Sequence, residues 1–365
     1  MQTKLVSVRQ LDTKEAKEGL LEAAEKIRLG GLVVFPTETV YGLGADATNP
    51  AAAENIYKAK GRPSDNPLII HVATPEDAEP YAVTSPLYYM LASRFMPGPL
   101  TVIMPVRSTI PPTVTASLPT VAVRCPEHPA ARELIRLAGV PIAAPSANLS
   151  GSPSPTTAAH AAADMMGRVD MILDGGPSHV GLESTIVKIE DDGSLLLLRP
   201  GGITKEELEV MGCSVHIADA VVGAIKEGER VLSPGMKYKH YAPKTPLYLL
   251  DGDREACFAY LKERQARMQA DKRLGVLAYG EDVSVLAALL PDARILSFGS
   301  KEDEWEQAQR LFALLRESDT LEVHELYAPL PSKNGMGLAL YNRMIRAAAH
   351  QIIKTDAADL SVSDR

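Results

Sequence analysis

Cysteine is scarce in this chain of 365 residues, which holds only Cys125, Cys213 and Cys257. None of the three belongs to a Cys-x-x-Cys pair, so the sequence predicts neither a disulfide framework nor a zinc site. Such sparse, scattered cysteine is typical of a reducing compartment, and we expect a cytoplasmic protein. The first residues lack the apolar core of a signal peptide and no apolar run is long enough to cross a bilayer, so we expect no membrane association.

The chain also lacks an excess of basic over acidic residues. The formal net charge is −8 at pH 7, which argues against a broad nucleic-acid-binding surface but leaves room for a local basic pocket. Hydrophobic content of 45% with 23% charged residues is the balance of an ordinary globular protein. The length is enough for two domains.

Several catalytic signatures are absent. Gly176-x-x-x-x-Gly181 is not followed by Lys and Ser or Thr, so it is no phosphate-binding loop of the Walker type. There is no Gly-x-Ser-x-Gly elbow and no catalytic Cys/His pattern. Gly42-x-Gly44 is only part of a dinucleotide fingerprint, and we interpret these two glycines as residues that permit a tight turn.

What the sequence does contain is a compact cationic stretch, in which Lys58, Lys60 and Arg62 are spaced two residues apart. A helix is predicted over residues 49–57 and ends near Gly61 and Pro63. We expect the three cations to leave the helix end on a constrained turn and to cluster around an anion. The simpler alternative is that they only interact favourably with the helix dipole.

Short apolar runs followed by polar loops predict strands of an α/β fold. In the first part of the chain these strands are expected at residues 32–35, 68–72, 102–106, 119–126, 140–144, 171–174, 183–187 and 195–198. Helices are expected at residues 15–30, 85–95 and 130–138. In the last part, strands at 247–250, 274–278, 294–298 and 323–326 alternate with helices at 254–269, 302–315 and 338–353. The second pattern indicates a small parallel sheet with helices on both faces.

We therefore predict two domains, 1–232 and 246–365, joined by a connector at 233–245. The connector is rich in proline, lysine and tyrosine and holds no acid. A flexible tether would favour Gly and Ser instead. We consider two interpretations, a lid in which Tyr238 meets a nucleotide and a stiff spacer that only sets the distance between domains.

Polar side chains gather in the loops at the predicted strand ends, the usual position of ligand contacts in α/β folds. They are Thr39, Lys58, Lys60, Arg62, Asn66, His71, Arg124, Ser146, Asn148, Ser154, Ser184 and Arg199. Cations and hydroxyls without an obvious nucleophile suit phosphate chemistry, where positioning and charge stabilisation dominate. Taken singly, the serines could be caps or turn residues, His71 a structural histidine and Arg199 a surface strand end.

Four motifs occur in order: Pro36-Thr-Glu-Thr-Val-Tyr-Gly-Leu-Gly, Lys58-Ala-Lys-Gly-Arg-Pro with Asn66-Pro-Leu, Pro145-Ser-Ala-Asn-x-Ser-Gly, and Ser233-Pro-Gly-Met-Lys-Tyr-Lys-His-Tyr-Ala-Pro. Together they resemble L-threonylcarbamoyladenylate synthases of the two-domain kind. The resemblance implies a YrdC-like catalytic domain built on a twisted open sheet, followed by a smaller Rossmann-like parallel α/β domain. It covers nearly the whole chain.

The resemblance also implies site residues. The family's signature cluster falls on Lys58, Lys60, Arg62, Ser146 and Asn148, of which Lys58, Lys60 and Arg62 are expected to be catalytic. The implied ATP contacts are Arg62, Asn66, Thr120, Ser146, Asn148, Ser154, Arg199 and Tyr238. The implied L-threonine contacts are Thr39, His71, Arg124, Ala144 and Ser184. No metal-ligating residue is expected.

The implied reaction joins L-threonine, bicarbonate and ATP into threonylcarbamoyl-AMP and pyrophosphate, with Mg²⁺ accompanying ATP. The product is expected to reach a separate machinery that modifies adenosine beside the anticodon of tRNA, so direct tRNA binding should be weak or absent. Two alternatives remain open, an RNA-binding or ribosome-associated module and a carbamoyltransferase that uses carbamoyl phosphate. The sequence assigns no independent task to the second domain.

Overall fold

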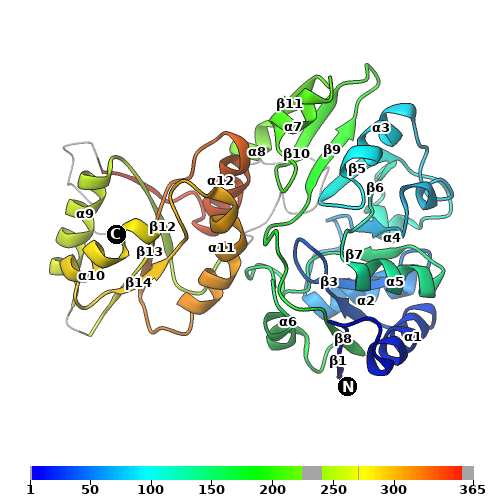
Figure 1. The fold of residues 1–365 in the computed structure, drawn as a ribbon, viewed down its shortest axis with the longest axis horizontal. Helices are drawn as coiled ribbons and strands as arrows, with labels where there is room; N and C mark the ends of the chain where they lie inside the picture. Colours follow the sequence, from blue (N-terminus) through cyan, green and yellow to red (C-terminus); the bar gives the residue numbers. More distant parts are fainter. Residues whose placement is uncertain (1, 224–240, 270, 356–365) are drawn as a thin grey trace. The chain divides into compact units, whose positions relative to one another are not determined.

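The computed structural model describes residues 2–223, 241–269 and 271–355 (Figure 1). The chain divides into two compact units, Met1–Tyr238 and Lys239–Arg365. Residues 233–240 of the predicted connector, with Tyr238 and the lid hypothesis, lie outside the described residues. The domain limits 1–232 and 246–365 therefore stay a prediction.

The first unit is built on one mixed sheet, which in the described residues has 11 strands in the order β1-β8-β2-β3-β7-β4-β6-β5-β9-β10-β11. The strands are β1 (Lys4–Ser7), β2 (Val33–Phe35), β3 (Gly42–Asp46), β4 (Ile69–His71), β5 (Leu100–Pro105), β6 (Thr120–Arg124), β7 (Ile142–Ala144), β8 (Met171–Asp174), β9 (Thr185–Ile189), β10 (Leu195–Arg199) and β11 (Val215–Ile217). Its central pairs alternate in direction, since β4 runs parallel to β6 but antiparallel to β7.

Helices of the first unit bury one apolar face each. They are α1 (Lys14–Arg28), α2 (Pro50–Lys60), the 3₁₀ helix η1 (Pro75–Ala78), α3 (Pro86–Phe95), α4 (Pro112–Thr115), α5 (Pro129–Ala138), α6 (Ala158–Met165), α7 (Lys205–Val210) and α8 (Asp219–Val222). In α1, Ala16, Leu20, Ala23 and Ile27 recur at helical spacing and are buried in one core with Leu134 of α5. The amphipathic helix predicted here is confirmed.

The ends of α2 have clear local causes. The Asn49 side chain accepts hydrogen bonds from the backbone N–H groups of Ala51 and Ala52, and Pro50 occupies the first turn. At the other end Gly61 adopts a left-handed conformation with φ 62°, which glycine tolerates best. The helix therefore stops where the sequence predicts, although it includes Lys58 and Lys60.

The turn expected at Gly42 and Gly44 is wrong, because both glycines lie in strand β3. A Cβ atom at Gly44 would lie 2.7 Å from the Ile142 side chain and 2.8 Å from the Phe35 ring. The glycines are therefore required by close packing inside the sheet, not by a turn.

The second unit has a five-stranded sheet in its described residues, in the order β14-β13-β15-β12-β16, and every pair in it is parallel. Its elements are β12 (Leu247–Asp251), α9 (Arg254–Arg267), β13 (Leu274–Ala278), the 3₁₀ helix η2 (Gly280–Asp282), α10 (Val283–Leu289), β14 (Arg294–Ser297), α11 (Glu304–Ser318), β15 (Glu325–Pro329), α12 (Gly335–Ala347) and β16 (Ile352–Lys354). Helices α9 and α10 cover one face and α11 and α12 the other (Figure 1). The predicted fold class, a large open sheet followed by a smaller parallel α/β domain, is confirmed.

The helix expected over residues 338–353 is wrong at its end. Helix α12 stops at Ala347, Ala349 and His350 adopt positive φ angles of 48° and 63°, and the chain then forms β16 beside β12. The pattern missed this break because neither Gly nor Pro marks it. In the part of the chain that the structure describes, no helix has both the length and the apolar character to cross a membrane.

Candidate active site

Strand register brings three of the polar side chains into one row. His71 on β4 is the direct neighbour of Arg124 on β6, and Arg124 is the neighbour of Thr101 on β5. The Thr101 hydroxyl lies 2.8 Å from the hydroxyl of Ser184, the residue that precedes β9. The three predicted residues His71, Arg124 and Ser184 therefore converge across neighbouring strands.

Arg124 is the charged centre of this row. Its Nη2 donates to Oε1 of Glu38 at 2.6 Å, and Glu38 also accepts the backbone N–H of Glu127 at 3.1 Å. The Nε atom of Arg124 is buried and has no hydrogen-bond partner among the described residues. Buried donors are nearly always paired in folded proteins, so an unpaired one indicates a place for a ligand acceptor.

The imidazole of His71 is held in a neutral form. Burial and, to a smaller extent, the nearby Arg124 cation together lower its pKa from 6.5 to about 3. Nδ1 of the ring lies 3.2 Å from the Ile142 carbonyl oxygen, and the Phe35 ring meets the imidazole edge-on. His71 can therefore exchange hydrogen bonds at neutral pH, but it is a poor general base.

A second group of contacts joins β9 to the end of β10. Arg199 donates from Nε to the Ser184 carbonyl oxygen at 3.0 Å and from Nη2 to the Ser184 hydroxyl at 3.1 Å. A Cβ atom at Gly201 would lie 2.4 Å from the Glu183 carbonyl oxygen, so only glycine allows this approach. The Ser154 hydroxyl donates to the Glu183 carboxylate at 2.5 Å. Ser154, Ser184 and Arg199 thus belong to one buried cluster.

Lys60 joins the last turn of α2 to the loop after β7. Its side chain is buried, and Nζ donates to the carbonyl oxygens of Ser146 and Asn148, both at 2.5 Å. The Ser146 hydroxyl donates to Oδ1 of Asn148 at 2.5 Å. Three residues of the predicted signature cluster, Lys60, Ser146 and Asn148, are therefore in direct contact.

Lys58 does not join them. It lies on the exposed side of α2, with Nζ 3.7 Å from the carboxylate of Glu54. Residues two apart on a helix are rotated by about 200°, so a helix that includes both lysines points them in opposite directions. The expected clustering of Lys58 with Lys60 is wrong, and a catalytic role for Lys58 stays a prediction.

Arg62 and Asn66 lie on the turn that follows α2. Nη2 of Arg62 donates to the carbonyl oxygens of Asn66 and Pro67, at 3.4 and 3.3 Å. The side-chain amide of Asn66 is buried, and neither its nitrogen nor its oxygen has a partner among the described residues. An amide left unpaired in this way is a second position where a ligand could complete the hydrogen bonding.

The remaining predicted residues occupy strand ends and turns. Thr39 is buried, with its hydroxyl 2.8 Å from that of Thr37. Ala144 ends β7 and Thr120 begins β6. Tyr238 is outside the described residues.

Glu38, Glu183 and Thr101 were not among the predicted site residues, although each contacts one of them. Glu38 stands inside the motif that begins at Pro36, and Glu183 directly precedes Ser184. A carboxylate between short apolar strands is a signal, because acids are rarely buried without a partner.

No cluster of three or more His, Cys, Asp or Glu side chains suited to a metal ion occurs in the described ranges. The donors gathered around Lys60 and Arg124 are ammonium, guanidinium, hydroxyl and amide groups. Such a set is chemically suited to phosphate and carboxylate oxygens.

Two family models match the chain. One, described as telomere recombination, matches residues 25–201, and one described as the C-terminal domain of threonylcarbamoyl-AMP synthase matches residues 203–349. A threonylcarbamoyl-AMP synthase of Bacillus subtilis is 44% identical over 337 residues, which are 92% of this chain and 94% of that protein. The chain belongs to the threonylcarbamoyl-AMP synthase family.

Further members of this family agree in sequence and in structure. A threonylcarbamoyl-AMP synthase of Pyrococcus abyssi is 43% identical over 335 residues, covering 91% of this chain and 94% of that protein. A solved structure of Pyrococcus abyssi Sua5 complexed with L-threonine is similar with a TM-score of 0.86 and 40% identity, and the match covers 96% of this chain and 99% of that one.

Membership in the threonylcarbamoyl-AMP synthase family makes the chain an enzyme, an ATP-using transferase whose product is linked to AMP. The resemblance stated from the four motifs is confirmed, and with it the two-domain type. The enzyme prediction is confirmed over the RNA-binding module and the carbamoyltransferase.

Proposed function

We propose that the first unit joins L-threonine, bicarbonate and ATP into threonylcarbamoyl-AMP and pyrophosphate. The observation that carries this proposal is the buried Nε donor of Arg124, which has no partner among the described residues and stands beside the neutral His71 and the Ser184 hydroxyl. This combination suits a small molecule that carries a carboxylate and a hydroxyl, as threonine does.

In this mechanism the threonine carboxylate accepts hydrogen bonds from Arg124. Glu38 already balances part of the guanidinium charge and fixes its orientation, so the free Nε–H is directed before substrate arrives. Thr39 and Ser184 provide hydroxyl groups for the threonine side chain or amine. The buried setting strengthens each of these interactions relative to water.

The covalent steps need no nucleophile from the protein. The threonine amine attacks bicarbonate to form a carbamate with loss of water, and a carbamate oxygen attacks the α-phosphorus of ATP. The bond to the β-phosphate oxygen breaks, and pyrophosphate leaves with the electron pair. Because His71 has a pKa of about 3, the imidazole acts as a neutral hydrogen-bonding group and not as the base.

Charge repulsion is the main obstacle, since both the carbamate and the triphosphate are anions. Lys60, Arg62 and Arg199 supply the positive charge that offsets it. Lys60 is rigidly held by two carbonyl oxygens, so little reorganisation is needed as charge develops in the transition state. The unpaired amide of Asn66 gives ATP a further donor. The Ser146 hydroxyl donates its one proton to Asn148, so in this arrangement it offers ATP only an acceptor oxygen.

Mg²⁺ enters this proposal with ATP. The ion would be held mainly by oxygens of ATP rather than by protein ligands, and when bound it would neutralise phosphate charge. Ser154 and Glu183 present oxygen donors of the kind that Mg²⁺ prefers, and they lie next to the predicted ATP contact Arg199 through Ser184.

We further propose that the product serves the threonylcarbamoyl modification of adenosine beside the tRNA anticodon, through a separate transfer machinery. A net charge of −8 supports weak or absent direct tRNA binding. Free thiols at Cys125, Cys213 and Cys257 support a cytoplasmic location.

The decisive experiment incubates the purified full chain with ATP, Mg²⁺, L-threonine and labelled bicarbonate. We expect labelled threonylcarbamoyl-AMP by mass spectrometry and pyrophosphate release that depends on both threonine and bicarbonate. Reactions that omit one substrate, or replace L-threonine by L-valine, which lacks the hydroxyl, serve as controls. Pyrophosphate release at the same rate without threonine, or no adenylate at all, would overturn the proposal.

A further inference from the structure

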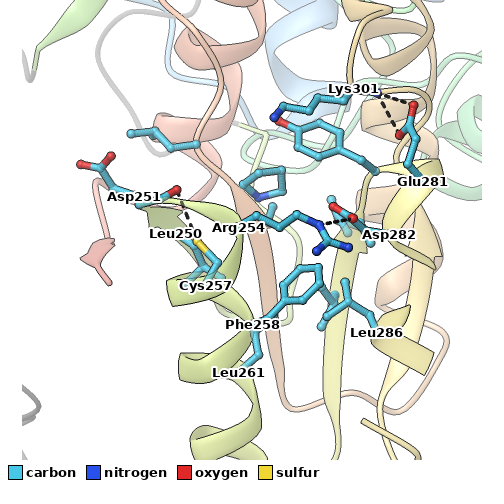
Figure 2. A pocket seen from close by; sticks show the side chains of 18 of the residues that line it. Leu250, Asp251, Arg254, Cys257, Phe258, Leu261, Glu281, Asp282, Leu286 and Lys301 are labelled. Carbon is cyan, nitrogen blue, oxygen red and sulfur yellow. Dashed lines mark hydrogen bonds and ion pairs between the residues drawn. The ribbon is translucent and has the colours of Figure 1, made fainter. Parts of the chain in front are cut away.

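A pocket of about 520 Å³ opens at the carboxyl ends of strands in the second unit (Figure 2). This volume lies in the range of small-molecule sites, about 300–1,000 Å³. Its walls come from the ends of β12, β13 and β15, from α9, and from η2 with the start of α10.

The topology of the sheet explains why a pocket forms there. Strands β13 and β15 are neighbours, but the chain leaves β13 toward β14 at one edge and leaves β15 toward β16 at the other. Loops that diverge from adjacent parallel strands leave a crevice at their carboxyl ends, which is where α/β sheets bind ligands.

One side of the pocket is apolar and the other is polar. Figure 2 shows Phe258, Leu261 and Leu286 together on one side of an ion pair between Arg254 and Asp282. Nε of Arg254 lies 2.7 Å from Oδ1 of Asp282, and the guanidinium carbon lies 4.5 Å from the centre of the Phe258 ring. A ligand with an apolar body and one polar head would match this division.

Four carboxylates line the pocket, those of Asp251, Glu281, Asp282 and Glu302, and two of them are already engaged. Glu281 accepts hydrogen bonds from the Ser300 hydroxyl at 2.6 Å and from the backbone N–H of Lys301, and Asp282 is paired with Arg254. The carboxylate of Asp251 points away from the other labelled side chains in Figure 2.

Several hydrogen-bond donors on the polar side of the pocket are still available to a ligand. Lys301 extends inward in Figure 2, and its ammonium has no hydrogen bond or ion pair within the described residues. Burial raises the pKa of Tyr279 to about 12, so its hydroxyl stays protonated at neutral pH and can donate. Together with the remaining N–H groups of Arg254, these donors can hydrogen-bond to a ligand head group that carries acceptor oxygens.

A nucleotide is a poor match for the same pocket. In doubly wound folds, free backbone N–H groups at a helix N-terminus bind the phosphates. Here the Asp253 carboxylate accepts the N–H of Ala256 at the start of α9, and the Asp303 carboxylate accepts those of Trp305 and Glu306 at the start of α11. The acidic caps of α9 and α11 occupy these groups and would repel a polyphosphate. The start of α10 has no side-chain cap, but the Asp282 carboxylate stands there as its N-terminal neighbour.

We propose that this pocket binds a small monocarboxylate whose body is an apolar ring or a branched chain. The apolar body packs against Phe258, Leu261 and Leu286. The carboxylate accepts hydrogen bonds from Lys301 and Arg254. The site belongs to the second unit, for which the sequence predicts no ligand.

Cys257 gives a readout that is specific to this pocket. It lines the pocket and is partly exposed, whereas Cys125 and Cys213 are buried. The full chain is treated with methyl methanethiosulfonate, and the labelling rate of each cysteine is followed by peptide mass spectrometry. The probes are indole-3-propionate and tryptamine, which share a ring but carry opposite head charges, with 3-phenylpropionate, 4-methylvalerate and ATP added in parallel.

We expect indole-3-propionate to slow Cys257 labelling at least fivefold at a concentration where tryptamine and ATP have no effect. Lys301→Gln should weaken this protection about tenfold, while Lys262→Gln, which changes an exposed lysine on α9, should leave it unchanged. Circular dichroism checks the fold of both variants. The proposal would be overturned if tryptamine or ATP protected Cys257 from labelling as well as indole-3-propionate or better. It would also be overturned if Lys301→Gln left the protection unchanged, or if none of the three carboxylates protected Cys257.

Discussion

Glu38 and Arg124 form an ion pair inside the first unit, with Oε1 and Nη2 2.6 Å apart and side chains that are 0% and 5% exposed. The two residues are far apart in the sequence, on the turn after β2 and at the end of β6. The pair therefore connects the motif that begins at Pro36 to the neighbouring strands on which His71 and the contact partner of Ser184 lie. A buried pair of this kind is costly to break on one side only, because the remaining charge stays uncompensated.

Removal of one partner should thus harm the fold more than removal of both. We expect Glu38→Leu to lower the stability of the first unit by about 3–5 kcal/mol, the usual cost of leaving a buried charge unpaired. The double variant Glu38→Leu with Arg124→Met should recover a large part of that loss. Differential scanning calorimetry of the full chain measures both, and a double variant no more stable than the single one would contradict this account.

His71 gives the chain a specific response to acid. Its folded-state pKa of about 3 is below the ordinary value of 6.5, so the unfolded chain binds a proton on acidification before the folded chain does. The stability that His71 contributes is complete above about pH 6.5 and is lost as pH falls toward 3. The loss from this group is about 1.4 kcal/mol per pH unit within that window.

Urea denaturation between pH 6 and pH 4 tests this dependence. The unfolding free energy of the wild type should fall more steeply with decreasing pH than that of His71→Gln, by up to about 1.4 kcal/mol per unit. His216→Gln changes an exposed histidine of the same unit and should keep the wild-type slope. Identical slopes for wild type and His71→Gln would show that the imidazole is protonated in the folded protein.

The sequence predicted the elements whose signals are local. The capped helix around α2, the amphipathic α1 and strands β12 to β15 of the second unit follow from spacing and composition within a few residues, whereas β16 was predicted as part of a helix. β3 was missed because its two glycines imitate a turn, and the Phe35 ring that requires them is a tertiary neighbour.

The sequence predicted which residues belong to the candidate site, but it did not predict which of them contact one another. Motif resemblance selected Arg124 and Lys60, and the structure gives each a buried position with defined partners. The sequence did not identify Glu38 as the partner of Arg124, because this contact joins a turn to a strand that is distant in the sequence. The expected clustering of Lys58 with Lys60 was wrong for a related reason, since the exact end of α2 decides which way the Lys58 side chain points.

Lys60 and Lys58 offer a matched pair of tests on one helix. Lys60→Ala removes a buried cation bound to two carbonyl oxygens, so repulsion between carbamate and triphosphate is less compensated. We expect adenylate formation to fall at least tenfold, about 1.4 kcal/mol or more of barrier. Lys58→Ala removes an exposed cation and should change turnover less than threefold. Similar losses of adenylate formation in both variants would contradict this prediction, because they would mean that overall positive charge matters and the position of Lys60 does not.

Asn66 separates a binding role from a structural one, because its buried amide has no partner among the described residues. Leucine has nearly the same shape, so Asn66→Leu removes a buried polar group whose desolvation costs about 1–3 kcal/mol without breaking any contact seen in the structure. We expect an unchanged or higher melting temperature together with at least tenfold weaker ATP binding by isothermal titration calorimetry.

Asn148→Leu is the matched comparison, since the Asn148 amide donates to the Leu149 and Ser152 carbonyl oxygens and accepts from Ser146. Its loss leaves those groups unpaired, so the melting temperature should fall clearly. If Asn66→Leu instead destabilises the protein as much as Asn148→Leu and binds ATP normally, Asn66 is a structural residue and the nucleotide contact assigned to it is wrong.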